Sequence, residues 1–314
     1  MEKKYRAGLI GVGSIAHIAH LPILAARNDV EMAGAFAEHI GSVQLTQKSY
    51  AIQHAVHNMD ELLSLGLDCA FVLSPKTVHA EQVIRLLEAG VDVFCEKPMG
   101  MTLKEAYDMA DASARTGRKL MIAFNRRYAP VYRKAKEIYG QISPDVLIAQ
   151  KNRPASEYRA TLENAIHMVD ILRYFCGECI KVEACSKFTD PLYEPLTTAQ
   201  LQFENGSVAM LVANRASGQW VETLEMHGHN KSVLVNCPDS ITVTDAEQSH
   251  TTSMTPLAYG WAKVIDKMGF TQEVDHFFDC LAHDKEPLTN GADAYKTQEL
   301  MHRILTAAGL PGLE

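Results

Sequence analysis

The sequence has few of the features that mark disulfide-stabilised or nucleic-acid-binding proteins. Its seven cysteines are an odd number scattered over 314 residues, so we expect no disulfide framework. Cys176 and Cys179 spell C-x-x-C, but no second pair supports a metal or redox site. No block of like charges forms a tail, and no basic stripe carries interleaved aromatic residues, which argues against a nucleic-acid partner. The net charge of −8 and the mixed composition predict a globular, cytoplasmic protein.

Charge is also absent from residues 7–26, which follow three basic residues as the apolar part of a secretory signal would. Three glycines, two histidines and a proline interrupt this run. They divide it into a strand, a glycine turn and the start of a helix. We therefore expect neither a signal peptide nor a membrane partner.

Short apolar runs alternate with helical patterns over the first part of the chain. The expected strands are residues 5–10, 30–36, 68–73, 91–95 and 119–124. Thr77 is expected to cap a helix that stops at Gly90, and Thr102 and Glu105 have the form of a capping box for a helix that stops near Gly117. Strands alternating with helices of this length predict a doubly wound parallel sheet, and we assign it to a domain at 1–122.

The pattern changes after residue 125, where strand signals separated by turns predominate. The expected strands are residues 142–153, 180–188, 197–203, 207–214, 221–228, 232–236 and 241–245. Residues 164–175, 269–282 and 292–308 read as helices. These signals predict a second domain at 123–314, of the α+β class, with a large, mostly antiparallel open sheet.

A G-x-G-x-x-A turn follows the first expected strand and opens a helix. The first glycine permits the tight turn, the second lets the backbone approach a pyrophosphate, and the alanine lets the helix pack on the strand. The predicted cofactor-binding residues of this turn are Gly11, Val12, Gly13, Ser14, Ile15 and Ala16. A structural glycine turn is the alternative, but the position at the start of a βαβ pattern favours a dinucleotide site.

The end of the second strand normally carries an acidic residue that binds the adenosine ribose. Here Ala37 occupies that position and Glu38 follows it. NAD and NADP both remain open as cofactors. Because residues 37–42 offer no Arg or Lys for a 2′-phosphate and Glu38 would repel one, the sequence favours NAD.

Two further groups carry residues suited to proton and charge transfer. Glu96-Lys97-Pro98 follows a strand, at the sheet edge where doubly wound folds bind ligands, although a lysine in a strand-end turn is the simpler reading. On a helix, Glu163, His167 and Asp170 would share one face, as a general base and its orienting carboxylates require. A surface ion-pair ladder is the alternative, and no second cluster supports a metal site.

Taken together and in this order, the motifs resemble the Gfo/Idh/MocA family of NAD(P)-dependent oxidoreductases. The resemblance rests on the glycine turn, Glu96-Lys97-Pro98, Asn125-Arg126-Arg127-Tyr128 and the helix through His167. Ser217-Gly218-Gln219, Gly260-Trp261, Gly269-Phe270 and His276-Phe277-Phe278 are similar to the MviM-like branch. The family implies a Rossmann domain followed by an α/β domain whose open sheet forms the interface of a homodimer or homotetramer.

The resemblance also implies roles for individual residues. Lys97 matches the catalytic lysine, His167 matches the proton acceptor of polyol dehydrogenases, and Glu163 stands where many members have Asp. Matching positions imply further cofactor contacts from Ser74, Pro75, His79, Glu96, Lys97 and Asn125.

The predicted activity is hydride transfer between a nicotinamide and a carbinol carbon of a sugar, polyol or related hydroxy compound. The expected substrate contacts are Lys97, Arg153, Tyr158, His167 and Asp170, with Lys151 as a further specificity candidate. A non-catalytic sensor of cofactor or metabolite on the same fold is the alternative, and it would be expected to lack Lys97 or His167. A metal-dependent hydrolase is disfavoured.

Overall fold

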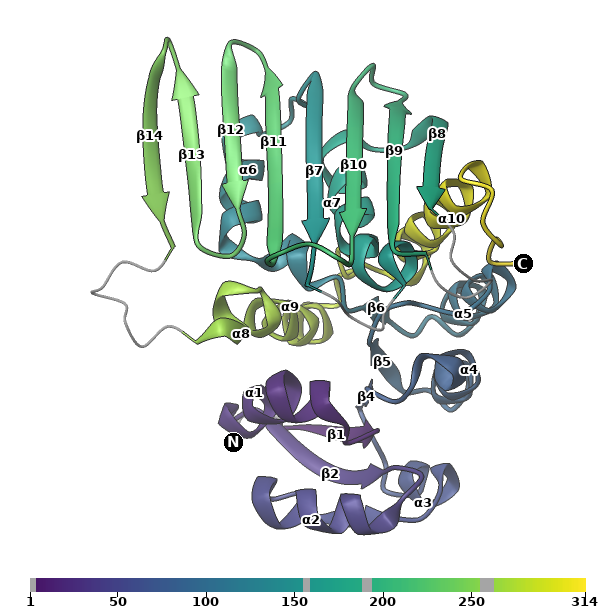
Figure 1. The fold of residues 1–314 in the computed structure, drawn as a ribbon. Helices are drawn as coiled ribbons and strands as arrows, with labels where there is room; N and C mark the ends of the chain where they lie inside the picture. Colours follow the sequence, from purple (N-terminus) through teal and green to yellow (C-terminus); the bar gives the residue numbers. More distant parts are fainter. Residues whose placement is uncertain (1–3, 155–158, 188–193, 255–262) are drawn as a thin grey trace. The chain divides into compact units, whose positions relative to one another are not determined.

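The computed structural model describes residues 4–154, 159–187, 194–254 and 263–314 (Figure 1). The chain forms two compact units. Unit 1 contains Met1–Ala123, Phe270–Gln298 and Glu314, and unit 2 contains Phe124–Gly269 and Glu299–Leu313. The division at residues 122 and 123 stays a prediction, while the contacts group Phe270–Gln298 with the N-terminal part.

Unit 1 is built on a six-stranded sheet with the strand order β3-β2-β1-β4-β5-β6. The strands are β1 (Tyr5–Ile10), β2 (Val30–Phe36), β3 (His54–Val56), β4 (Cys69–Val72), β5 (Asp92–Cys95) and β6 (Leu120–Ile122). All five strand pairs are parallel. Every residue of β4 and β6 is buried, because helices cover both faces of such a sheet. The predicted doubly wound parallel sheet is confirmed.

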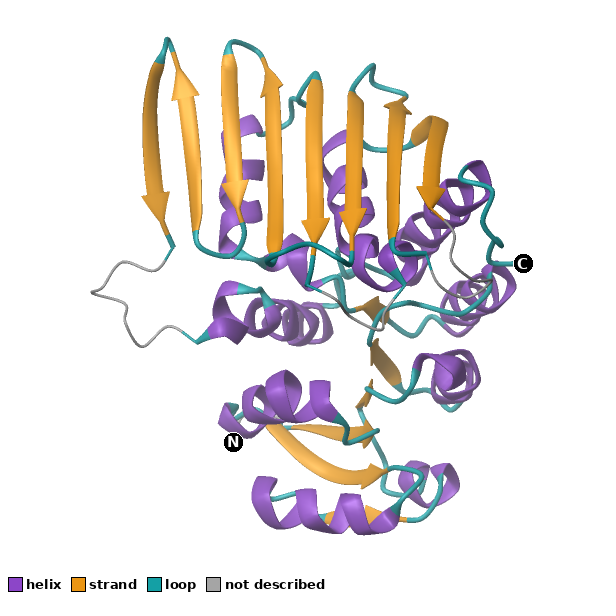
Figure 2. Ribbon diagram, in the orientation of Figure 1, coloured by secondary structure: helices purple, strands orange, loops and turns teal. Residues whose placement is uncertain are grey.

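The helices of unit 1 connect these strands along the chain, apart from α9, which comes much later in the sequence (Figure 2). They are η1 (Ala16–His20), α1 (Leu21–Ala26), α2 (Ile40–Tyr50), α3 (Met59–Leu63), η2 (Lys76–Val78), α4 (His79–Glu88), α5 (Leu103–Thr116) and α9 (Phe270–His283). Thr102 and Glu105 form the predicted capping box of α5, and Gly117 ends that helix at φ +64°. Thr77 caps no helix. The Val78 N–H donates to the Pro75 carbonyl at 3.1 Å, so a 3₁₀ turn precedes α4 and contains Thr77.

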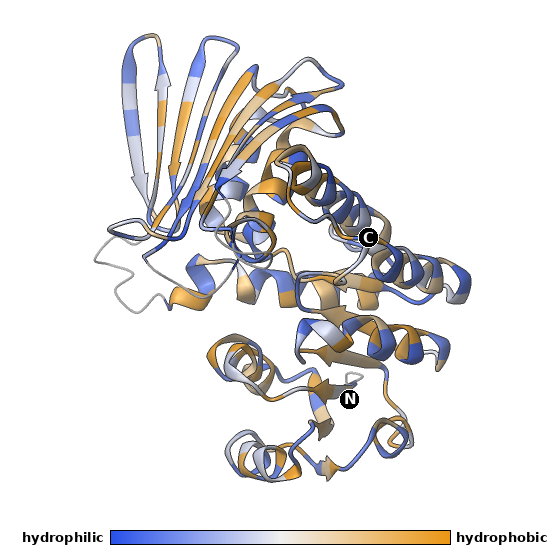
Figure 3. Ribbon diagram, turned by 45° about the vertical axis from the view of Figure 1, so that its right-hand side comes forward, coloured by the Kyte–Doolittle hydropathy of each residue, from blue (hydrophilic) through white to orange (hydrophobic). Residues whose placement is uncertain are grey.

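Unit 2 is built on an eight-stranded sheet with the order β14-β13-β12-β11-β7-β10-β9-β8. The strands are β7 (Val146–Asn152), β8 (Cys179–Lys187), β9 (Leu196–Phe203), β10 (Val208–Asn214), β11 (Val221–Gly228), β12 (Lys231–Asn236), β13 (Ser240–Asp245) and β14 (Gln248–Ser253). The pair β7–β10 is parallel, and the other pairs are antiparallel. This confirms the large, mostly antiparallel sheet. The sequence reading missed β14, which is wholly polar and exposed (Figure 3).

Helices cover one face of this sheet. They include η3 (Asn125–Tyr128), α6 (Pro130–Tyr139), η4 (Ala160–Ala165) and α7 (Ile166–Cys176). The short helix α8 (Val264–Lys267) follows the sheet in the chain. Helix α6 packs on β12 and β13, and α7 packs on β7 and β10, as Figure 1 shows. Gly177 ends α7 at φ +79°. All seven cysteines are free thiols that form no disulfide. Helix α10 (Gly291–Ala307) joins the two units in sequence. Among the described residues, no helix is long and apolar enough to cross a bilayer.

Candidate active site

The glycine turn after β1 has the geometry that a dinucleotide needs. Gly11 has φ +89°, and a Cβ atom there would lie 2.6 Å from the Ser74 backbone nitrogen, so only glycine fits. A Cβ atom on Gly13 would meet nothing within 4 Å, so this backbone faces open space. Ala16 is fully buried, and the chain is helical from Ser14 onward. This arrangement fits a pyrophosphate: Gly11 lies tightly against the backbone, Gly13 faces open space, and a helix begins directly after them.

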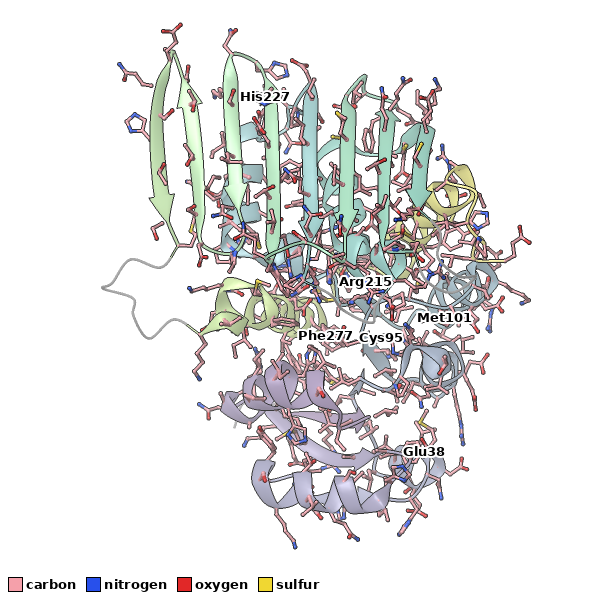
Figure 4. All side chains as sticks on the ribbon, in the orientation of Figure 1. Glu38, Cys95, Met101, Arg215, His227 and Phe277 are labelled. Atoms are coloured by element: carbon pink, nitrogen blue, oxygen red, sulfur yellow. The ribbon has the colours of Figure 1, made fainter. Side chains whose placement is uncertain are left out.

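The end of β2 lies beside this turn, because the Gly11 N–H donates to the Phe36 carbonyl at 2.8 Å. Ala37 and Glu38 follow Phe36 directly, and the Glu38 side chain is exposed (Figure 4). The structure therefore brings Glu38 to the sheet edge that carries the glycine turn. Ala37 itself has no group that accepts a hydrogen bond from a ribose.

His79 joins the loops that follow β4 and β5. Its Nε2 lies 3.0 Å from the Ser74 carbonyl oxygen and its Nδ1 lies 3.0 Å from the Pro98 carbonyl oxygen. The side chain is 1% exposed. Burial lowers the pKa of His79, although the two carbonyls oppose that shift. His79 thereby fixes the two loops that contain the predicted cofactor residues Ser74 and Pro75 and the predicted catalytic Lys97.

Glu96 forms a hydrogen bond with a histidine that was not among the predicted site residues. His20 Nε2 lies 2.8 Å from Glu96 Oε1, and the Lys97 N–H donates to Glu96 Oε2 at 3.2 Å. His20 is fully buried against the rings of Phe94 and Phe270. Burial alone would raise the pKa of Glu96, but the hydrogen bond from His20 and the nearby positive charges lower it. A buried carboxylate thus fixes the backbone on which Lys97 stands.

In unit 2, the predicted base lies at the start of α7. His167 is 7% exposed, and Asp170 is fully buried, which excludes a surface ion-pair ladder. Arg127 donates to both Asp170 oxygens, at 2.8 and 2.6 Å, in a bidentate pair. Glu163 lies in the π-helical turn η4, where its Oε2 accepts from the Arg159 N–H at 2.7 Å. The three residues therefore do not follow one regular α-helical face.

A second buried ionic cluster stands where β7 and β11 meet η3. Arg126 donates to Glu222 from Nε at 2.5 Å and from Nη2 at 3.0 Å, and Lys151 also donates to Glu222. Lys151 and the Glu222 side chain are both fully buried. Burial and the charge of Arg126 lower the pKa of Lys151 to about 7, against the opposing effect of Glu222. Burial would raise the pKa of Glu222, but its two cationic partners lower it far below the usual range.

The remaining predicted residues lie around this cluster or outside the described part of the chain. The Arg153 guanidinium carbon lies 4.0 Å from the centre of the Trp220 ring. Asn125 is buried, and its side-chain amide donates to the Met268 carbonyl at 3.0 Å. Tyr158 and the Gly260-Trp261 pair lie outside the described residues. No metal-binding group of three or more His, Cys, Asp or Glu residues occurs in the described ranges.

Comparison with known proteins identifies the family to which this fold and site belong. Residues 5–124 match the model described as "Oxidoreductase family, NAD-binding Rossmann fold", and residues 152–309 match "Oxidoreductase family, C-terminal alpha/beta domain". The chain therefore belongs to the Gfo/Idh/MocA oxidoreductase family. It is an oxidoreductase with an NAD-binding domain, as the resemblance implied.

Similar proteins span nearly the whole chain. The putative oxidoreductase YceM of Salmonella typhimurium is 26% identical over 312 residues, covering 95% of this chain and 96% of that protein. The scyllo-inositol 2-dehydrogenase (NAD(+)) of Bacillus subtilis is 21% identical, covering 94% and 91%. The crystal structure of the dehydrogenase MviM from Clostridium difficile has a TM-score of 0.88 at 24% identity, covering 97% of this chain and all of that one.

Proposed function

We propose that this protein is a dehydrogenase or reductase that transfers a hydride between NAD and a carbinol carbon of a sugar, an inositol-like polyol or a related hydroxy compound. The observation that carries the proposal is Lys97, which stands at the carboxyl end of β5 on backbone fixed by Glu96, with His79 holding the adjacent loop. The near full-length similarity to scyllo-inositol 2-dehydrogenase supports the substrate class.

In the proposed reaction, a bound nicotinamide supplies the hydride acceptor. An imidazole nitrogen of His167 takes the proton of the substrate hydroxyl, and the Lys97 ammonium donates to the same oxygen and stabilises its negative charge. Glu163, the third proposed catalytic residue, orients His167. Arg153, Asp170 and Tyr158 complete the proposed substrate contacts, with Asp170 acting through its bidentate pair with Arg127.

The proposed cofactor contacts lie mainly at the carboxyl edge of the parallel sheet. They are Gly11, Val12, Gly13, Ser14, Ile15, Ala16, Ala37, Glu38, Ser74, Pro75, His79, Glu96, Lys97 and Asn125. Glu38 supports NAD over NADP, because an exposed carboxylate beside the glycine turn accepts from ribose hydroxyls and repels a 2′-phosphate.

We propose further that the enzyme is a cytoplasmic homodimer or homotetramer formed through the open face of the large sheet. Along β10, buried residues alternate with outward-facing ones. The outward face carries apolar side chains that are about half exposed, including Met210 at 52% and Leu234 at 43%. Light scattering tests the oligomeric state, and a charged substitution of Met210 should shift it toward monomer. Seven free thiols support a reducing compartment.

A turnover assay tests the proposed activity. Polyols, sugars and sugar phosphates are incubated with NAD or NADP in both directions, and the absorbance of the reduced nicotinamide is followed. Lys97→Met and His167→Asn should each abolish most turnover, whereas His229→Asn, at an exposed histidine of β11's turn, should not. Normal NADH binding with no turnover of any compound would favour a non-catalytic binding protein instead.

A further inference from the structure

We propose that His20 is a positioning residue of the proposed hydride transfer: a buried hydrogen bond from His20 keeps Glu96 ionised, and the Glu96 carboxylate in turn orients Lys97 and stabilises its positive charge. The inference rests on the proposed function, in which Lys97 binds the reacting oxygen. It adds to that site a residue that acts through another and does not touch the substrate. All three residues belong to unit 1.

His20 lies at the end of a helical turn of a rare type. The π-helical turn Ala16–His20 interrupts the helix that opens at the glycine turn. Such turns occur frequently at functional sites. His17 and Ile18 in this turn are exposed, whereas Ala19 and His20 are fully buried. The turn therefore directs the His20 imidazole into the interior of unit 1, close in sequence to the residues that we assign to the cofactor.

The His20 ring is packed among aromatic rings and, within the described part of the chain, makes one hydrogen bond. The ring centres of Phe94, Phe270 and Phe71 lie 5.3, 6.0 and 6.3 Å from its own. Its Nε2 lies 2.8 Å from Glu96 Oε1, whereas its Nδ1 has no hydrogen-bond partner among the described residues. Because a carboxylate only accepts hydrogen bonds, Nε2 carries the proton. An apolar side chain would fill this position without burying an unpaired nitrogen, so the hydrogen bond to Glu96 is what a histidine adds here.

His20 makes the largest contribution to the ionisation of Glu96, which follows Cys95 at the end of β5 (Figure 4). Burial raises the pKa of Glu96, and the hydrogen bond and charge of His20 oppose burial most strongly. The charges of Lys97 and His79 act in the same direction as His20, and the balance lowers the pKa. Cys95, the other described titratable group beside Glu96, stays neutral because burial raises the pKa of its thiol. Removal of His20 should therefore raise the pKa of Glu96.

The Glu96 carboxylate acts on Lys97 through the backbone and through its charge. The Lys97 N–H donates to Glu96 Oε2 at 3.2 Å, which fixes the backbone from which the lysine side chain extends. The attraction between the two charges is mutual: Lys97 lowers the pKa of Glu96, and Glu96 stabilises the ammonium form of Lys97 by the same interaction. The proposed reaction needs this ammonium, because a positive charge stabilises a developing negative oxygen. Loss of the Glu96 charge should therefore lower kcat more than it raises KM.

The pH dependence of carbonyl reduction separates His20 from the proposed base. The reaction is followed with NADH and the carbonyl product of whichever compound the assay panel oxidises. In this direction His167 must carry its proton, so acid does not inactivate wild type by titrating His167. In His20→Leu, Glu96 binds a proton at a higher pH than in wild type. On the acid side kcat should therefore fall about tenfold below wild type, the change expected when a charged group is lost from the site.

Two further variants show whether the hydrogen bond or the packing of His20 is responsible. His20→Gln keeps a donor for Glu96 and should recover most of the wild-type pH profile. His17→Leu is the matched control, because His17 lies in the same π-helical turn, is exposed, and has its Nε2 3.2 Å from Thr46 Oγ1. It should leave the profile unchanged. A profile of His20→Leu that runs parallel to that of wild type would overturn the proposal.

The two steps of the proposal can also be measured without turnover. Infrared difference spectra show the carbonyl band of a protonated carboxyl group, and the band missing from Glu96→Gln belongs to Glu96. This band should appear at a higher pH in His20→Leu than in wild type. Competitive acetylation, quantified by mass spectrometry, measures the reactivity of Lys97. In Glu96→Gln, Lys97 should react about three- to tenfold faster at a fixed pH because less of its amine is protonated, with the exposed Lys104 as the internal reference.

The outcomes distinguish this inference from the proposed function. An infrared band at the same pH in His20→Leu and wild type, or unchanged labelling of Lys97 in Glu96→Gln, would overturn the inference. Turnover by wild type would leave the proposed function standing in either case. The expected infrared and labelling results without turnover of any compound would remove the proposed function and leave the coupling of His20, Glu96 and Lys97.

Discussion

The proposed ligand-binding edges of the two units consist of different chemical groups. In unit 1, the edge consists mainly of backbone: a glycine that tolerates no Cβ atom, a glycine that faces open space, and loops held through their carbonyls by His79. In unit 2, it consists of buried ions, with Arg126 and Lys151 on Glu222 and Arg127 on Asp170. A cofactor common to many reactions suits a backbone cradle, whereas a particular substrate needs side chains that differ between enzymes.

The strongest test of this comparison removes the proposed base of unit 2, His167, while the glycine turn and loops of unit 1 stay intact. His167→Asn should lower kcat by roughly 10²–10⁴, the usual contribution of a positioned base. The affinity for NADH, measured by fluorescence titration, should stay within about twofold of wild type. Wild-type turnover by this variant would show that His167 has a structural role.

Substitutions in the buried ionic clusters of unit 2 should also reduce the free energy of unfolding more than substitutions in unit 1. Glu222→Gln leaves Arg126 and Lys151 buried without their carboxylate, which should reduce the free energy of unfolding by about 3–5 kcal/mol. Urea denaturation measures the loss. Glu225→Gln, on the same strand but half-exposed, should change stability by less than about 1 kcal/mol. Equal effects of the two substitutions would contradict the cluster's role.

Among its described residues, unit 1 contains a buried hydrogen bond between a histidine and a carboxylate, His20 and Glu96, and this contact allows a comparable test. His20→Leu removes the hydrogen bond to Glu96, so the effect of burial, which raises the pKa of that carboxyl, is opposed less strongly. The loss should be about 1.5–3 kcal/mol near neutral pH. Because acid protonates Glu96, the stability difference from wild type should shrink as the pH falls.

Urea midpoints measured across pH for wild type, His20→Leu and His20→Gln decide this point. The Gln variant keeps a donor for Glu96 and should recover part of the loss. A pH-independent difference would mean that His20 contributes only by packing against its aromatic neighbours.

The smallest expected effect concerns the relative affinity for NAD and NADP, which we assign to Glu38 beside the glycine turn. Glu38→Ala should weaken NAD binding by about two- to tenfold and leave NADP binding unchanged or stronger, because one exposed hydrogen-bond acceptor is lost. Dissociation constants for both cofactors measure the change, with Glu88→Ala as the control at an exposed acid of α4. Tighter NADP binding by wild type would reverse the expected preference.

The same contrast explains what the sequence predicted. The parallel sheet and its glycine turn were predictable, because backbone requirements leave local signals: β1 and β2 were predicted with the bounds that the structure has. The first strand of the β11–β14 series was also predicted with its observed bounds. Helix α2 and strand β3 were missed, because a weakly patterned helix and a three-residue strand leave little periodicity.

The ionic partners of unit 2 were missed for a different reason. Arg126 and Glu222 are far apart in the sequence, so no local motif joins them. One signal was present: Glu222 shares the buried face of β11 with Leu224 and Met226, as Lys151 shares the buried face of β7 with its apolar neighbours. A charged residue on the apolar side of a strand predicts a buried partner, although it does not identify that partner.

The parallel pairing of β7 with β10 has a consequence for how the chain is made. As the ribosome releases the chain, β7 emerges before either of its neighbours, β10 and β11, exists. Strands β8 and β9 pair locally, as do β11 to β14. Strand β7 is therefore the last of the early strands to find its partners, and until then both of its hydrogen-bonding edges are open. A nascent chain halted before Val208 would expose β7, and an open strand edge is prone to pairing with other chains.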